Sequence, residues 1–204
     1  SVTKGTYVDS YYDYRKAYSN ILPWGIGSEG VTQKSDNYKL TELPIHSAIS
    51  IDSEAFKKFV PNLYYKLRFG INPSKSEFEW MRQRDAIKSV RYPASRRAYK
   101  KHENKNFSWY VNKILSKNAI QLDYDYVPAS AFVKMLENIL EDKSLKKYRA
   151  TDIVIPVIAS GHVKDMHNTD NVKRILEGIE NKLKDKVVYM KLSEAVVSAN
   201  KNLI

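Results

Sequence analysis

Residues 153–162, reading IVIPVIASGH, constrain the fold of this 204-residue chain more than any other stretch. A nearly unbroken apolar run of this length, closed by Ser160 and Gly161, is typical of a strand buried on both faces in a parallel sheet covered by helices. We therefore predict a buried strand that places His162 at its carboxyl end. Because α/β folds keep their chemistry at this end of the strands, His162 is the leading candidate for a catalytic side chain.

The sequence after this run alternates between helical and strand-like patterns. Residues 169–184 carry apolar side chains at helical spacing, with Asn168 or Thr169 at the N-cap position. Residues 187–190 form a second short apolar segment, and residues 192–199 fit a last short amphipathic helix. The order strand, loop, helix, strand, helix predicts a parallel α/β unit.

Four stretches of the chain, taken in order, resemble polysaccharide deacetylases. Residues 160–197, SGHVKDMHNTDNVKRILEGIENKLKDKVVYMKLSEAVV, are similar to the C-terminal end of that family, where a strand ends in a histidine, a helix follows and an LSEA turn closes the chain. Residues 1–17, the strand-like LTELPI at 40–45 and the strand and helix pattern at 121–140 resemble earlier segments. The resemblance covers most of the chain outside residues 51–120.

The resemblance implies an α/β fold, namely the C-terminal portion of a distorted (β/α)7-type barrel. Residues 1–204 would form a single domain or fragment, with a basic helical insertion at about 51–120. The implied activity is the metal-dependent hydrolysis of N-acetyl groups from a carbohydrate, by a carbohydrate esterase that acts on C–N bonds other than peptide bonds. In such an enzyme His162 would protonate the departing amine.

The motifs that bind the metal in this family are absent from the sequence. Members carry an Asp-Asp pair, an H-x-x-x-H pair and an R-x-P-Y element ahead of the matched region, whereas the histidines here are His46, His102, His162 and His167. The resemblance implies that the complete enzyme uses a divalent metal, with zinc as the expected ion. Because the motifs are absent here, we expect no residue of this chain to bind it. A companion N-terminal segment or an oligomer is expected to complete the barrel.

Five further residues are candidates for binding the carbohydrate. Tyr14 and Trp24 belong to a region rich in Tyr and Gly that either lines a carbohydrate groove, because ring faces pack on sugars, or forms a long covering loop. Asp123 and Asp125 alternate on a predicted strand and either accept hydrogen bonds from sugar hydroxyls or lie on a solvated face. Lys164 belongs to the same loop as the candidate catalytic histidine.

Basic residues are concentrated in one part of a chain whose net charge is +11. Residues 82–118 hold eleven basic residues and two acidic ones, next to a helix predicted from residue 76 and stopped by Pro93. This basic block is either a solvated helical face or a surface for an anionic polymer. The alternative function is therefore a non-catalytic basic module that binds nucleic acid or an anionic glycan.

Other classes of protein are excluded by what the sequence lacks. It has no apolar stretch approaching the ~20 residues of a membrane span. The absence of cysteine excludes disulfides and thiolate metal sites and leaves the cellular compartment open. No glycine-rich phosphate loop, G-x-S-x-G elbow or H-E-x-x-H helix is present, which argues against nucleotide hydrolysis, serine-esterase chemistry and zincin proteolysis.

Overall fold

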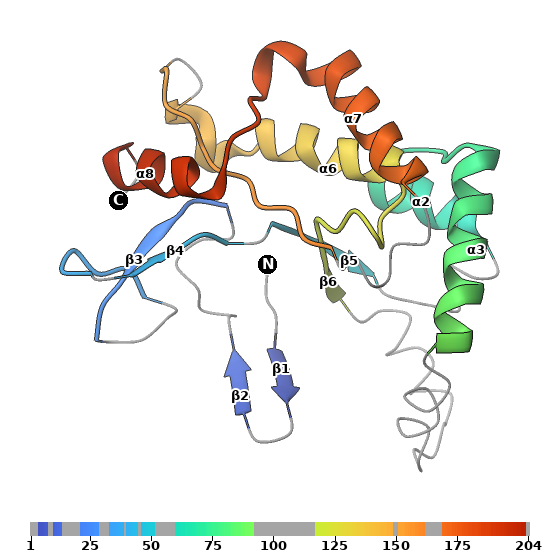
Figure 1. Ribbon diagram of the computed structural model, residues 1–204, viewed down its shortest axis with the longest axis horizontal. Helices are drawn as coiled ribbons and strands as arrows, with labels where there is room; N and C mark the ends of the chain where they lie inside the picture. The colour runs from blue at the N-terminus through green and yellow to red at the C-terminus, as the bar shows by residue number, and fades with distance from the viewer. Residues whose placement is uncertain are drawn as a thin grey trace.

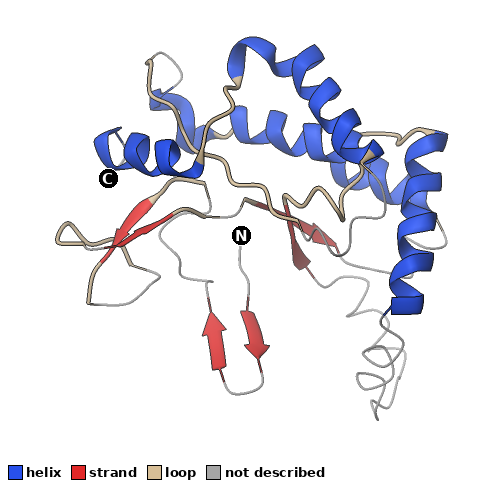
Figure 2. Cartoon of the chain, in the orientation of Figure 1, coloured by secondary structure: helices blue, strands red, loops and turns tan. Residues whose placement is uncertain are grey.

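A computed structural model describes residues 4–7, 10–13, 21–28, 33–38, 40–44, 46–51, 60–91, 117–148, 151–161 and 169–202. These residues form a predominantly helical molecule in which short strands pair two by two (Figure 1). The helices gather on one side and most of the strand pairs lie on the other (Figure 2). None of the described helices is both long and apolar enough to span a bilayer.

The four helices predicted from the sequence, from residue 76, within 121–140, at 169–184 and at 192–199, are present, and the structure adds a helix at Pro61–Phe69 that was not predicted. The structure contains α2 (Pro61–Phe69), α3 (Lys75–Arg91), α6 (Ala129–Leu140), α7 (Asp170–Leu183) and α8 (Leu192–Asn202), and short 3₁₀ helices at Lys143–Tyr148 and Lys184–Lys186. Helix α2 begins at a proline, whose missing N–H costs nothing there, and ends at Gly70 in the left-handed conformation, φ 67°. These α2 termini follow directly from their residue types.

The strands are short and pair in antiparallel fashion. The pairs are β1 (Lys4–Tyr7) with β2 (Ser10–Asp13), β3 (Trp24–Ile26) with β4 (Leu40–Glu42), and β5 (Ser47–Ile51) with β6 (Lys117–Gln121). Strand β4 confirms the strand expected in LTELPI. The β3·β4 hairpin is joined to α8 by a hydrogen bond of 2.8 Å from the Thr41 hydroxyl to the side-chain oxygen of Asn200.

The prediction of a doubly buried strand at residues 153–162 is wrong for residues 153–157, which have no regular secondary structure. The side chain of Val157 is 37% exposed. Pro156 stands in the middle of the run and has no N–H to donate to a strand ladder, which explains why the pairing fails there. Residues 158 and 160, near the end of the run, are in isolated β-bridges, and the bridge of Ser160 is a parallel one with Asp123.

The second predicted strand, at residues 187–190, is also wrong, because these residues form an irregular connection between α7 and α8. Val188 is 62% exposed and Tyr189 is 66% exposed, so this apolar segment is not buried in a sheet. The described residues therefore contain both helices and strands, but no barrel is formed among them.

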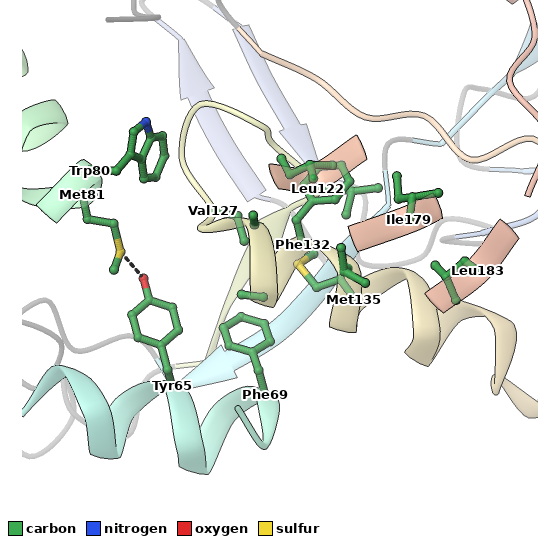
Figure 3. Close-up of a cluster of buried hydrophobic side chains, with 14 of the residues drawn as sticks. Tyr65, Phe69, Trp80, Met81, Leu122, Val127, Phe132, Met135, Ile179 and Leu183 are labelled. Carbon is green, nitrogen blue, oxygen red and sulfur yellow. Dashed lines mark hydrogen bonds between the residues drawn. The ribbon is translucent and has the colours of Figure 1, made fainter. Parts of the chain in front are cut away.

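The larger of two hydrophobic clusters among the described residues joins α2, α3, α6 and α7 (Figure 3). Its buried members come from α2, α3, α6, α7 and the segment between β6 and α6, and include Tyr65, Phe69, Trp80, Met81, Leu122, Val127, Phe132, Met135, Ile179 and Leu183. The Tyr65 hydroxyl donates to the Met81 sulfur over 3.0 Å. The helices of the predicted insertion at 51–120 therefore pack into the same core as α6 and α7.

Helices α6 and α7 pack closely because of a glycine at their contact. A Cβ atom added to Gly178 of α7 would lie only 2.7 Å from Cγ2 of Val133 in α6. A contact this short is not tolerated between real side chains, so the absence of a side chain at Gly178 permits the approach of the two helices. This close packing places the two helices that follow the Asp123–Ser160 bridge next to each other.

Candidate functional site

Two segments of the chain run parallel at the bridge, and each leads toward a helix. The N–H of Ser160 donates to the carbonyl of Leu122 over 2.9 Å, and the N–H of Tyr124 donates to the carbonyl of Ser160 over 3.1 Å. Residues 122–127 form a turn that leads into α6, and we call it the 122–127 turn. Helices α6 and α7 begin beside each other at this end of the molecule (Figure 1).

The backbone of Gly161 lies against an aromatic ring of the 122–127 turn. A Cβ atom added to Gly161 would overlap the ring of Tyr124, so that any other residue at this point would require the ring to move. The next residue in the chain is His162, which lies outside the described residues, as do Tyr14 and Lys164. The structure thus fixes the chain up to the residue before the candidate catalytic histidine.

The two aspartates of LDYDYVP do not alternate on a strand as predicted. Residues 124–126 form a turn in which the Asp125 N–H donates to Oδ1 of Asp123 over 2.8 Å. The carbonyl of Asp123 accepts the N–H groups of Tyr126 and Val127. The prediction of a strand is wrong because an aspartate side chain that bonds its own backbone two residues on favours a turn over a strand. Asp125 is buried.

Asn171 in the first turn of α7 holds the 122–127 turn from the inside. Its side-chain N–H groups donate to the carbonyls of Tyr124 and Val127, each over 2.9 Å, and its oxygen accepts the Ala129 N–H over 3.0 Å. The residue is 1% exposed. Both donors and the acceptor of the amide are used, as burial of such a group requires. We did not predict this residue from the sequence.

Arg84 of α3 holds the same turn from the outside. Its Nη1 donates to the carbonyl of Tyr126 over 2.5 Å, and its Nε and Nη2 donate to Oδ1 of Asp85. The guanidinium lies 5.2 Å from the centre of the Trp80 ring and 4.7 Å from that of Tyr126, so it makes cation–π contacts with both rings. Arg84 is 1% exposed, which no feature of the basic block had indicated.

The N-terminus of α6 is capped by side chains of other helices. Its N-cap residue is Pro128, which has no side-chain acceptor to offer, and the free N–H of Ser130 donates to Oε1 of Glu77 over 2.7 Å. The other carboxylate oxygen of Glu77 accepts the N–H of Ser74 over 2.7 Å, in a capping box at the start of α3. The buried Glu77 therefore stabilises the start of two helices at once.

Three cations of the basic block, Arg82, Arg84 and Lys88, interact with neighbouring side chains of this chain. Arg82 forms an ion pair of 2.8 Å with Glu79, and its hydrogen bond to that carboxylate lowers the pKa of Glu79. The ammonium of Lys88 lies 5.0 Å from the centre of the Tyr126 ring. Of these three cations, Arg84 is buried, whereas Arg82 is 77% exposed. Residues 92–116 of the block lie outside the described residues.

Trp24, a predicted sugar-binding residue, is buried within the protein. Its side chain is 1% exposed, so the ring offers no open face to a sugar. In the β3·β4 hairpin it pairs with Glu42. Desolvation by burial raises the pKa of Glu42, because the charged carboxylate is less well solvated there than in the unfolded chain.

Replacing Glu42 with glutamine should stabilise the protein at neutral pH. A pKa raised by folding means that the folded chain binds more protons than the unfolded chain within the titration window, so stability falls as pH rises through that window. Glutamine carries no charge at either pH, so Glu42→Gln removes the free-energy cost of burying a charged carboxylate at neutral pH. Urea unfolding at about pH 7 and about pH 4 should show an advantage of the variant that is present at the higher pH and absent at the lower one. An equal advantage at both values would contradict the assignment.

The described residues do not fit the divalent metal that the resemblance implies. No three His, Asp or Glu side chains within the described ranges are grouped as a metal site would require. One oxygen of Asp123, a carboxylate of the 122–127 turn, already accepts the N–H of Asp125. We therefore assign no metal ligand to these residues and derive no chemical step through a metal.

Comparison of the chain with protein-family models, with curated proteins and with solved structures finds no match. The interpretation of the site therefore depends on its own geometry and on the resemblance in the sequence. The structure brings Asp123 next to Ser160 through a parallel bridge that the sequence did not predict, and it buries Trp24 in the β3·β4 hairpin.

Proposed function

We propose that this chain contributes to the hydrolysis of N-acetyl groups from a carbohydrate, with His162 as the general acid. The observation that carries the proposal is the parallel pairing of Ser160 with Leu122 and Tyr124, two residues before His162 in the chain. Parallel segments that each lead to a helix bring the loops between them together, and α/β enzymes build their sites from such loops.

A histidine suits the step at which an amide bond breaks. Water adds to the acetyl carbonyl carbon, and the C–N bond then breaks as the departing nitrogen receives a proton, giving acetate and a free amine. The imidazolium of His162 would donate that proton near neutral pH, where histidine titrates. We assign neither the base that takes the proton of the attacking water nor the expected divalent metal to a described residue.

The predicted sugar contacts divide into two groups. We retain Tyr14, Lys164 and Asp123 as candidates, since Asp123 is only half-buried and lies at the bridge with Ser160. We reassign the other two, Trp24 and Asp125, to the framework because their side chains are buried. The alternative function, a basic module for nucleic acid or an anionic glycan, gains no support from Arg82, Arg84 and Lys88, which interact with other groups of this chain.

The direct test is the release of acetate from N-acetylated hexosamine oligomers by the protein as the cell makes it. We expect release that saturates with oligomer concentration and that yields one free amine for each acetate, as the proposed bond cleavage requires. O-acetylated sugars serve as the control, because their hydrolysis frees an alcohol and leaves the amine count unchanged. Failure to release acetate from any N-acetylated oligomer by folded protein would overturn the proposal.

A further inference from the structure

We propose that an open depression at the start of α3 is a saccharide-binding site, in which a sugar packs on the ring of Phe78 and bonds the pair of Glu79 and Arg82. The depression has a volume of about 780 Å³, within the roughly 300–1,000 Å³ of small-molecule sites. It belongs to residues 51–120, which the resemblance does not cover. Its lining consists of Ser74, Lys75, Ser76, Phe78, Glu79 and Arg82.

Phe78 supplies the aromatic surface of the depression. Its side chain is half-buried and packs against the larger hydrophobic cluster. Its ring lies 6.2 Å from that of Tyr65, at an interplanar angle of 68°, in an edge-to-face contact. The ring is therefore held by the core while part of it lines the depression. The negative face of an aromatic ring suits the C–H groups that a sugar ring presents on its apolar face.

A bidentate ion pair supplies polar groups beside this ring. The Nε and Nη2 atoms of Arg82 donate to the two carboxylate oxygens of Glu79 over 3.0 and 2.8 Å. The two side chains are 77% and 45% exposed, so the pair faces solvent. A guanidinium has five N–H groups, so three of those of Arg82 remain for a ligand. Sugar hydroxyls both donate and accept, and the pair offers them donors and acceptors in a fixed arrangement.

The hydroxyl of Ser76 adds a further acceptor. The Ser74 hydroxyl donates its one proton to Oε2 of Glu77 over 3.0 Å, so in its 3.0 Å contact with Ser76 it must accept. The Ser76 lone pairs then remain for a ligand hydroxyl. Glu77 also binds the N–H of Ser130 over 2.7 Å, which fixes this end of α3 to α6. The polar groups are thus held in place before a ligand arrives, which lowers the entropic cost of binding.

The charge of the depression favours a neutral ligand over a polyanion. Its lining contains two cations, Lys75 and Arg82, and Arg82 is paired with the carboxylate of Glu79. Binding of a polyanion depends on several cations that neutralise its charges, and the lining has an excess of only one. The saccharide class therefore follows from the described residues. The choice of an N-acetylated sugar within that class rests on the proposed function.

Binding can be located by nuclear magnetic resonance on the full chain. We expect the hexamer of N-acetylglucosamine to cause saturable amide shifts centred on residues 74–82. The affinity should change little with salt concentration, because a neutral ligand releases no condensed counterions. A single-stranded DNA oligomer is the comparison. Shifts of the same amides by DNA alone, with an affinity that falls steeply with salt, would overturn the saccharide assignment.

Three variants test the contacts themselves. Phe78→Leu keeps an apolar side chain against Tyr65 and removes the ring face, so it should weaken hexamer binding about 10-fold. Arg82→Ala should weaken binding several-fold, and it decides the matter should Phe78→Leu fail to fold. Tyr189→Leu is the matched control, because it removes a ring that is 66% exposed and lies outside the lining. Wild-type affinity in folded Phe78→Leu, or an equal loss in Tyr189→Leu, would overturn the site.

The outcomes separate this inference from the proposed function. Saturable hexamer binding at residues 74–82, in a protein that releases no acetate, would support the saccharide site and reject the deacetylase. Acetate release by a protein whose amides at 74–82 do not respond to the hexamer at millimolar concentration would reject the saccharide site and leave the proposed function standing.

Discussion

Replacing His162 with alanine should lower kcat for acetate release by about 100-fold or more, because general acid catalysis is typically worth ~10² to 10⁴. The loss follows from the need to protonate the departing nitrogen, for which alanine has no proton to give. The pH profile of kcat should change as well. In wild type the rate should fall as pH rises past the pKa of the imidazolium, and this basic limb should disappear in the variant.

His167→Ala is the matched control for this experiment. It removes a second imidazole from the same stretch of sequence, five residues away, and we assign it no part in the reaction. We expect near wild-type kcat in that variant and unchanged circular dichroism in both. Wild-type turnover in His162→Ala would remove this histidine from the mechanism, and an equal loss in the two variants would point to a shared structural effect.

Replacing Arg84 with alanine should lower the free energy of unfolding by about 3 kcal/mol, through the loss of buried packing and of a charge-assisted hydrogen bond. The carbonyl of Tyr126 would lose its donor, and the rings of Trp80 and Tyr126 would lose the guanidinium between them. Asp85 is largely exposed and would be hydrated instead. Urea unfolding, with the slope of the transition checked for constancy, measures the change.

Arg82 provides the control for Arg84 on the same helix. Its side chain is 77% exposed and pairs with Glu79 at the surface, so Arg82→Ala should leave the free energy of unfolding almost unchanged. Arg84→Lys should recover little of the loss, because an ammonium cannot reproduce the planar fork of the guanidinium. Equal stabilities of Arg84→Ala and Arg82→Ala would show that the buried contacts of Arg84 contribute nothing measurable.

The helices of this fold could be predicted because their signal is local. Apolar residues at helical spacing in α6 and α7 face the core, and Pro93 stands shortly after the end of α3, as predicted. The irregular conformation of residues 153–157 was missed, since a continuous apolar run has no periodicity that separates a strand from other buried segments, and the weight of Pro156, which lacks the N–H that a strand ladder requires, was not recognised. Within the run, a parallel bridge forms at Ser160, after the proline.

The framework of the candidate site was not accessible from sequence patterns. Asn171 contacts residues 42 to 47 positions away, Glu77 caps a helix 53 positions away, and Arg84 reaches a carbonyl 42 positions away. In a sequence, a polar residue of a helix that faces water cannot be distinguished from one that forms a buried hydrogen bond to a distant segment. The parallel bridge between Asp123 and Ser160 was not predicted either, since the predicted parallel unit joined residues 153–162 to residues 187–190.

The start of α6 has a consequence for how the molecule folds. A twelve-residue helix is marginal alone, and this one has no cap within its own sequence, so its first turn is complete only when α3 and α7 have both docked. Those contacts join residues more than forty positions apart in the sequence. The chain between them must lose conformational entropy before the caps can stabilise the helix. We infer that α6 becomes stable late, and that the described helices acquire their final order together.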